Sequence, residues 1–156
     1  MNVTLLERAL PQGERVLLDT SDLIAYFDGA ERVSPVAKHI MEQFVASGRN
    51  PAVVSMVTVM EVLVRPLKQG VGDAYRHVLD LLMRYPNLRL CDIDVFVAHQ
   101  AASMRASYGF SPVDALIIAS GLVSQVGHLV TNDATWRRKL QPIAPRIKVC
   151  YLGDYA

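Results

Sequence analysis

The stretch RVLLDTSDLIAYFDG, residues 15–29, decides the predicted fold. Its first five residues, 15–19, form an apolar run that ends on an acid, which is typical of a strand buried on both faces. Ser21 or Asp22 can then cap a short helix, and Gly29 can stop it. A buried strand that leads directly into a helix is the repeating unit of parallel sheets. The stretch therefore predicts an α/β fold.

The rest of the chain repeats this unit. Further strands are predicted at residues 52–55, 88–91, 128–131 and 147–152. One helix is expected to open with Ser34 and Pro35 and to end near Gly48, and the next carries Glu61 until Pro66 disturbs it. The other expected helices are an amphipathic one with Tyr75, Val78 and Leu82, two over residues 94–107 and 111–127, and a short one around Trp136. The alternation predicts a three-layer α/β/α architecture with a mainly parallel central sheet.

Length and composition indicate one globular domain. The chain has 156 residues, of which 51% are hydrophobic and 20% charged, a composition suited to a packed core and unlike that of disordered chains. Its net charge of +1 gives no overall field that would draw it onto nucleic acid or an anionic membrane. Any binding of either kind must therefore use a local patch.

The sequence gives no sign of export or of a membrane anchor. No segment approaches the ~20 uninterrupted apolar residues of a membrane-spanning helix, and the start of the chain lacks the features of a secretion signal. Cys91 and Cys150 lack the spacing of zinc or redox motifs, so we expect both thiols to be reduced and buried in strands. The expected location is the cytoplasm, with no membrane partner.

Four acids fall near the expected strand ends. Asp19 ends the first strand, Glu61 lies in the helix after the second, Asp114 opens a helix, and Asp133 follows the fourth strand. Ligands of an open parallel sheet bind in the crevice outside the carboxyl ends of the strands. Carboxylates gathered there repel one another unless a hard divalent cation neutralises them. The pattern therefore predicts a Mg²⁺ or Mn²⁺ site and chemistry on a phosphodiester.

Each acid also has a purely structural interpretation. Asp114 can complete a capping box with Ser111, and Asp133 can cap the next helix. Asp19 can satisfy backbone donors in its own turn. Glu61 can be a solvated helical residue, although the apolar residues around it make an unpaired carboxylate costly there.

Several other chemistries lack their motifs. The chain has no P-loop and no HExxH zinc motif, and the segment from Gly109 to Val113 lacks the last glycine of a nucleophile elbow. The triplet at residues 19–21 lacks the second aspartate of the dehalogenase-like enzymes that phosphorylate an aspartate. The missing motifs favour metal-dependent chemistry at the four acids.

The segments around these acids resemble the PIN-domain nucleases, and specifically the VapC-type toxins of bacterial type II toxin–antitoxin systems. The matching segments are Asp19-Thr20-Ser21 with Leu23-Ile24-Ala25, Ser55 with Val57-Thr58 and Glu61-Val62, Asp114-Ala115-Leu116-Ile117-Ile118-Ala119, and Leu129-Val130-Thr131-Asn132-Asp133. They occur in the order that the family shows, and they span most of the chain.

The resemblance implies a Mg²⁺- or Mn²⁺-dependent endoribonuclease. The implied catalytic and metal-binding residues are Asp19, Glu61, Asp114 and Asp133, and the implied supporting residues are Ser21 and Thr131. The three aspartates would hold the cation directly or through water, and the glutamate would place a second ion or the attacking water. A water activated by the metal would attack phosphorus in line. The implied substrate is a structured RNA, either a transfer RNA or a ribosomal RNA loop.

Two features depart from the pattern of the family. Trp136 stands where the family usually has phenylalanine, and residues 1–14 precede its usual first strand. Neither is expected to touch the four acids. The expected organisation is an N-terminal extension, residues 1–14, followed by a single PIN-like nuclease domain, residues 15–156. The extension would be an added helix that uses Val3, Leu6 and Leu10, or would partly reflect a start assigned too early.

The resemblance also implies two protein partners. One is a cognate antitoxin, a DNA-binding protein whose C-terminal tail inhibits the toxin, and the other is a second copy in a homodimer. The tail would lie on apolar side chains of the early helices, unless these are core residues: Leu23, Tyr26, Phe27, Ile40 and Phe44. The candidate RNA contacts, unless they only form solvated helix faces, are Arg32, Arg65, Lys68, Arg137, Arg138 and Lys139.

Two other functions fit the same residues. The chain could be a free-standing PIN nuclease without an antitoxin, or a PIN-like module that binds a partner without catalysis. A nuclease that no adjacently encoded protein inhibits would favour the first, and a complete lack of metal binding would favour the second.

Overall fold

The structure is a computed structural model that describes residues 1–70 and 72–156. Five strands form one sheet in the order β3-β2-β1-β4-β5, and every neighbouring pair is parallel. The strands are β1 (Val16–Leu18), β2 (Ala52–Ser55), β3 (Leu88–Cys91), β4 (His128–Thr131) and β5 (Lys148–Tyr151). Each lies within one residue of its expected bounds. The α/β fold with a parallel central sheet is confirmed.

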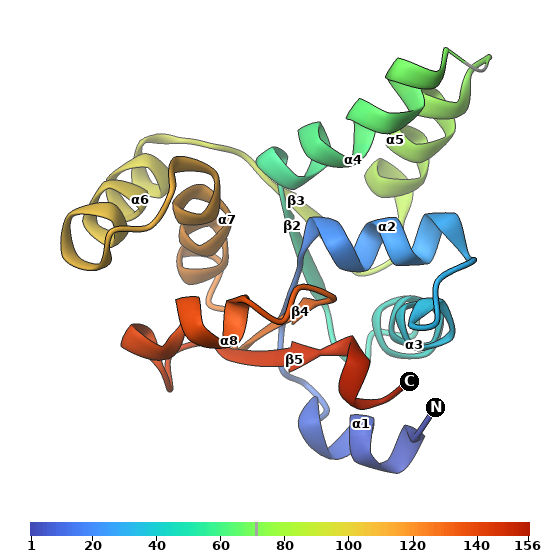
Figure 1. Ribbon diagram of the computed structural model, residues 1–156, viewed down its shortest axis with the longest axis horizontal. Helices are drawn as coiled ribbons and strands as arrows, with labels where there is room; N and C mark the ends of the chain where they lie inside the picture. The colour runs from blue at the N-terminus through green and yellow to red at the C-terminus, as the bar shows by residue number, and fades with distance from the viewer. Residues whose placement is uncertain (71) are drawn as a thin grey trace.

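Helices cover both faces of the sheet, so the predicted three layers are also confirmed (Figure 1). The helices are α1 (Val3–Ala9), α2 (Thr20–Asp28), α3 (Ser34–His39) with its π-helical continuation η1 (Ile40–Val45), α4 (Met56–Gln69), α5 (Ala74–Arg84), α6 (Val95–Tyr108), α7 (Pro112–Val123) and α8 (Trp136–Lys139), with the short 3₁₀ turns η2 (Gln141–Ile143) and η3 (Leu152–Asp154). No helix within the described residues is long and apolar enough to cross a membrane.

Alternation along the strands divides the interior into two apolar cores. Val16 and Leu18 of β1 pack with α1, α2 and α3, whereas Leu17 between them packs with α6, α7 and Trp136. Successive strand residues point to opposite faces, so a strand covered on both sides must be apolar throughout. Cys91 and Cys150 are buried in β3 and β5 as unpaired thiols, as expected.

The strand order places a topological switch beside β1. The chain runs outward from β1 to β2 and β3, then returns to place β4 on the other side of β1. Chain segments leaving β1 and β4 therefore diverge at the carboxyl ends of these strands and leave a crevice. Asp19 directly follows β1, and Asp133 follows β4 by one intervening residue.

Residues 1–14 pack tightly onto this sheet. Leu6 and Leu10 are fully buried in the core that contains β1. The amide of Asn50 donates to the carbonyls of Pro11 and Glu14 at 2.7 and 2.9 Å. The two ends of the chain also meet, because the N–H of Asn2 donates to the Tyr155 carbonyl at 3.0 Å, and Figure 1 shows them side by side. The division into residues 1–14 and 15–156 stays a prediction.

The start of α2 differs from the expected one. The backbone of Asp19 is still extended (φ −84°, ψ 162°), and its N–H donates to a carbonyl of β4 at 3.0 Å. The helix therefore begins at Thr20, and Ser21 and Asp22 lie inside it rather than capping it. Gly29 ends the helix as expected, in the left-handed conformation (φ 68°) that glycine adopts readily.

Two helix ends were also predicted wrongly. α4 continues through Pro66 to Gln69, because a proline in the last turn removes only one of the helix's own hydrogen bonds. α7 ends at Val123 rather than near residue 127. Gln125 takes a positive φ of 57°, which turns the chain toward β4.

Three residues expected to receive an antitoxin tail belong to the core instead. Leu23 and Ile40 are fully buried and Phe44 is 2% exposed, all within the core that covers β1. The apolar periodicity of the early helices is therefore explained by packing against the sheet. Tyr26 and Phe27 remain partly exposed.

Candidate active site

A pocket of about 260 Å³ lies where the chain leaves the carboxyl ends of β1 and β4. It is lined by Asp19, Thr20, Ser21, Ile24, Glu61, Val113, Asp114, Ile117, Asp133 and Trp136. The structure thus brings all four predicted acids to one pocket, which we call the acid pocket. They come from the start of α2, from α4, from α7 and from the turn before α8.

Asp19 is the most firmly held of the four acids. Its side chain is 5% exposed, and Oδ2 accepts hydrogen bonds from Ser21 Oγ (2.9 Å), Thr131 Oγ1 (2.7 Å) and Trp136 Nε1 (3.2 Å). It makes no capping bond to the backbone of α2. Three donors that converge on one oxygen fix the orientation of the carboxylate.

Ser21 and Thr131 connect segments that meet at the acid pocket. Their hydroxyl oxygens are 3.0 Å apart, which joins α2 to the end of β4. Ser21 Oγ accepts the backbone N–H of Asn132 at 2.8 Å, and Thr131 Oγ1 accepts that of Asp133 at 2.9 Å. Small hydroxyl side chains therefore satisfy the turn after β4 while also donating to Asp19.

Glu61 enters the pocket from α4. Its Oε2 accepts a hydrogen bond from Thr20 Oγ1 at 2.5 Å. The apolar residues around it do not enclose it, because Met60 and Val64 are 56% and 42% exposed. Glu61 therefore avoids the cost expected of an unpaired carboxylate in an apolar stretch, since Thr20 pairs with it and it lines the pocket.

Asp114 and Asp133 share a lysine partner. Lys139 Nζ lies 3.0 Å from Asp114 Oδ2 and 3.8 Å from Asp133 Oδ2. Ser111 caps α7 by accepting the N–H of Asp114 at 3.2 Å, so half of the expected capping box is present. The Asp114 carboxylate itself points to the pocket and not only to its own helix.

Asp133 also has the local role that its position suggested. Its carboxylate accepts the N–H and the hydroxyl of Thr135 at 2.9 and 2.8 Å. Partial burial raises the pKa of Asp133, but the two Thr135 hydrogen bonds and the Lys139 ammonium outweigh it, so the pKa lies below its usual value. Asp133 is therefore held as a carboxylate, close to the other acids of the pocket.

The donors of the pocket fit a hard cation by their chemistry. They are carboxylate and hydroxyl oxygens, the ligand type that Mg²⁺ and Mn²⁺ prefer. Their present spacing is different, since among residues 1–70 and 72–156 no group of three or more His, Cys, Asp or Glu side chains is arranged to hold a metal ion. The Lys139 ammonium lies within 4 Å of two of these acids.

The six basic residues expected to contact RNA differ in their surroundings. Arg65 pairs with Asp28 at 3.3 Å, Arg137 pairs with Asp154, and Lys139 lies at the acid pocket. Arg32, in the turn before α3, Lys68 of α4 and Arg138 of α8 are exposed. Contact with RNA stays a prediction for all six.

Sequence reasoning missed two contacts in the pocket. Trp136 does touch the acids, because its indole N–H donates to Asp19, which corrects the expectation that it would not. Thr20 was quoted only as part of a motif, yet it holds Glu61. The indole N–H, which a phenylalanine lacks, was the available signal for Trp136.

Asp22 is a buried acid directly behind the pocket. Its side chain is fully buried, and neither carboxylate oxygen has a hydrogen-bond partner among the described residues. Burial, and then the nearby Asp19 carboxylate, raise its pKa well above the usual value. Asp22 therefore holds its proton to a higher pH in the folded protein than in the unfolded chain, which releases it near pH ~4.

Asp22→Asn is expected to stabilise the protein at neutral pH by about 1–2 kcal/mol, because the amide needs no proton to stay neutral. In the parent, the raised pKa of Asp22 lowers the free energy of unfolding. This loss of stability is fully present above the pKa of Asp22 in the folded protein, and it disappears as the pH falls toward the pKa of Asp22 in the unfolded chain. The advantage of the variant should therefore shrink between about pH 7 and pH 5. Urea unfolding of both proteins at the two pH values measures it, and an advantage that is absent or independent of pH would contradict the assignment.

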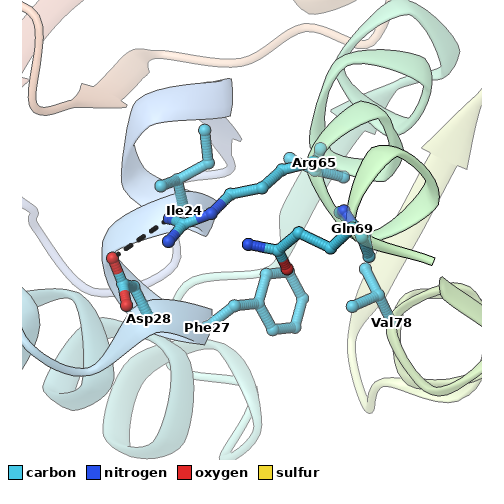
Figure 2. Close-up of a pocket in the computed structure, with 8 residues that line it drawn as sticks. Ile24, Phe27, Asp28, Arg65, Gln69 and Val78 are labelled. Atoms are coloured by element: carbon cyan, nitrogen blue, oxygen red, sulfur yellow. Dashed lines mark hydrogen bonds and ion pairs between the residues drawn. The ribbon is translucent and has the colours of Figure 1, made fainter. Parts of the chain in front are cut away.

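A second pocket, of about 250 Å³, lies between α2, α4 and α5 (Figure 2). We call it the apolar groove, and its lining residues are Ile24, Phe27, Asp28, Val62, Arg65, Pro66, Gln69 and Val78. The Asp28–Arg65 ion pair, drawn as a dashed line, lies beside the apolar side chains. Ile24 lines both the groove and the acid pocket, so the two adjoin.

The fold is similar to that of several solved toxin–antitoxin proteins. A toxin–antitoxin complex from Klebsiella pneumoniae has 22% identity and a TM-score of 0.63, over 88% of this chain and 97% of that chain. VapBC2 from Rickettsia felis, bound to a DNA fragment from its promoter, has 14% identity and a TM-score of 0.66, over 87% and 97%. The sarcin–ricin loop cleaving toxin VapC20 of Mycobacterium tuberculosis has 15% identity and a TM-score of 0.63, over 79% and 93%.

Similarity at these identities shows a shared fold. A search of curated protein sequences finds no significant match. The PIN domain family does match the sequence itself, over residues 16–139, a range that runs from β1 to the end of α8 and contains every acid of the pocket. With the family match and the parallel sheet in agreement, the chain belongs to the PIN domain family.

Proposed function

We propose that this protein is a metal-dependent endoribonuclease that acts in the cytoplasm as the VapC-type toxin of a toxin–antitoxin pair. The observation that carries the proposal is the convergence of four carboxylates from four separate segments in one pocket. Structural similarity to toxins of this kind supports it. Carboxylates that only capped their own helices would have no reason to meet.

The proposed metal ligands are Asp19, Asp114 and Asp133, with Glu61 placing a second ion or the attacking water. Bound Mg²⁺ or Mn²⁺ would neutralise the carboxylates, polarise a phosphodiester and lower the pKa of a water. The hydrogen bonds from Ser21 and Thr131 hold Asp19 in one orientation for this task. In the same way, Thr20 orients Glu61.

The proposed substrate is a structured RNA with an exposed loop, in a transfer RNA or ribosomal RNA. A backbone free of base pairing can bend into a small acidic pocket, whereas a regular duplex cannot. The Mycobacterium tuberculosis neighbour, described as cleaving the sarcin–ricin loop, supports a ribosomal loop. Arg32, Lys68 and Arg138 are exposed, and the proposed role of these basic residues is to contact the RNA backbone.

The proposed inhibitor is an antitoxin whose tail lies in the apolar groove. Ile24 and Phe27 line the groove, and its edge adjoins the acid pocket. A segment seated there could extend an arginine to Asp19 or Asp114 and compete with metal and RNA for these carboxylates. The complexes from Klebsiella pneumoniae and Rickettsia felis support a partner of this kind.

We also propose that the toxin forms a homodimer. Val95 and Phe96 of α6 and Val123 of α7 are exposed and line a common hollow. Large apolar side chains that gather on a surface often mark a contact between proteins. Light scattering of the purified protein tests the dimer.

Phe27→Glu is expected to weaken antitoxin binding about 100-fold or more, because a buried charge replaces an aromatic anchor. The test expresses the chain in bacteria with and without the small protein encoded beside its gene, and then measures RNA cleavage by the purified components. The chain alone should arrest growth and cut RNA, and the partner should abolish both effects. The Phe27→Glu variant should still cut RNA, which serves as the control for its fold, but should escape inhibition.

The outcomes separate the alternatives. A variant that is inhibited as strongly as the parent would place the antitoxin elsewhere. An active nuclease that forms no complex with the adjacently encoded protein would be a free-standing PIN enzyme. A chain that neither arrests growth nor cuts any RNA would be a PIN-like binding module, and the proposed function would be wrong.

A further inference from the structure

We infer that Lys139 is a built-in counter-ion of the acid pocket, which a divalent cation must displace, and that it thereby sets how tightly the pocket binds that cation. The inference rests on the proposed metal site. It concerns a residue that the sequence analysis named only as a candidate RNA contact. Its basis is the position of the ammonium group relative to two acids and one aromatic ring.

The ammonium of Lys139 is placed by three contacts. It lies 3.0 Å from Asp114 Oδ2 and 3.8 Å from Asp133 Oδ2, and 4.6 Å from the centre of the Trp136 ring. The side chain is only 30% exposed. A lysine that forms an ordinary surface ion pair has one partner and a largely solvated head, as Lys38 does with Glu42.

The helical backbone of α8 explains the position of the Lys139 ammonium. Trp136 is the first residue of the helix and Lys139 the last, so the two lie three positions apart and face the same side. Trp136 is buried and bonded to Asp19, which fixes the ring. The lysine stem can then lie across the ring and extend its head between the two acids, which is the geometry of a cation–π contact.

The ammonium therefore neutralises the same carboxylates that the proposed cation needs. Two carboxylates side by side are stabilised by one positive charge, whichever group carries it. The ammonium and a divalent cation repel each other, and both compete for Asp114 and Asp133. Binding of the metal must include the departure of Lys139 from these two acids, and the work of that departure lowers the metal affinity.

The other basic residues of α8 do not share this position. Arg137 pairs with Asp154 and stacks on Tyr151 of β5, and neither residue lines the acid pocket. Arg138 is exposed. Removal of the charge of Arg138 therefore provides a matched control, because it changes the net charge and the same helix equally.

The experiment titrates Mg²⁺ into metal-free parent, Lys139→Met, Lys139→Gln and Arg138→Met proteins and measures binding by calorimetry. Trp136, the single tryptophan of the chain, reports through its fluorescence whether the ammonium leaves the ring. Both Lys139 variants should bind Mg²⁺ about tenfold more tightly than the parent, and Arg138→Met should match the parent. The fluorescence change on binding should be large in the parent and small in the Lys139 variants. Without metal, the Lys139 variants should melt at a lower temperature than Arg138→Met.

The contrary results are distinct. Equal Mg²⁺ affinities in the Lys139 variants and in Arg138→Met would overturn the counter-ion role while leaving the metal site in place. No heat of Mg²⁺ binding by the parent or by any variant would overturn both the inference and the proposed metal dependence. Because Lys139→Met and Lys139→Gln differ in polarity but not in charge, agreement between them shows that the charge is the cause.

Discussion

Asp114→Asn and Asp19→Asn are each expected to lower the rate of RNA cleavage by about three orders of magnitude or more, while the protein still folds. The exchange replaces one carboxylate oxygen with an amide NH2 group and removes a negative charge that the proposed cation needs. A loss of this size corresponds to about 4 kcal/mol of transition-state stabilisation. Growth arrest on expression should disappear with it.

The fold should survive because the shape of the side chain is unchanged. The amide oxygen of an asparagine at position 19 can still accept the hydrogen bonds that Ser21, Thr131 and Trp136 give to Asp19. Removal of one of four mutually repelling charges also offsets part of the lost hydrogen-bond strength.

Asp94→Asn provides the matched control. Asp94 caps α6 by accepting the N–H of Val97 at 2.9 Å and is not among the residues that line the acid pocket. Asparagine caps helices as well as aspartate does, so this variant should cut RNA like the parent. Cleavage rates at saturating Mg²⁺, with circular dichroism to confirm folding, decide the matter. If both site variants cut RNA as fast as Asp94→Asn, the catalytic pocket has been assigned wrongly.

Removal of divalent cations is expected to stop cleavage completely, and addition of Mg²⁺ or Mn²⁺ should restore it. The products should carry a 5′-phosphate and a 3′-hydroxyl. Attack by an external water breaks the bond to the 3′ oxygen, whereas attack by the 2′-hydroxyl of RNA itself leaves a cyclic 2′,3′-phosphate. The second route needs a general base and a general acid, which are usually histidines. The residues that line the acid pocket include no histidine.

End-group analysis of a labelled RNA measures both parts of this prediction. The reaction is run with Mg²⁺, with Mn²⁺, with a chelator, and with the chelator followed by excess Mg²⁺. The last arm controls for irreversible damage to the protein. Cyclic phosphate ends, or cleavage that continues in the chelator, would refute water attack at a metal site.

The sequence by itself determined the elements and the order of the acids. Short apolar runs such as residues 52–55 and 128–131 are strands because alternate residues must be buried on both faces of the sheet. Caps are equally local, since Ser111 and Asp94 bond to N–H groups three positions away. The carboxyl ends of parallel strands then share one edge of the sheet, so the sequence places Asp19 and Asp133 on the same edge.

Only the tertiary structure decided which apolar and basic side chains are free. Ile40 and Phe44 are core residues, whereas Met60 and Val64 on a helix of equal apolar character are exposed. Periodicity shows that a helix has an apolar face, but what covers that face depends on distant segments. The same holds for the basic residues, because Arg137 and Lys139 are two positions apart in sequence and point to different partners.

The network around Asp19 shows the physical reason. Its partners Thr131 and Trp136 are 112 and 117 positions away along the chain, and Glu61 meets Thr20 across 41 positions. Local sequence fixes dihedral angles, caps and the spacing of apolar residues, which involve neighbours within about one helical turn. The strand order places β1 beside β4, and only this order brings the hydroxyl, the indole and the lysine ammonium to the acids.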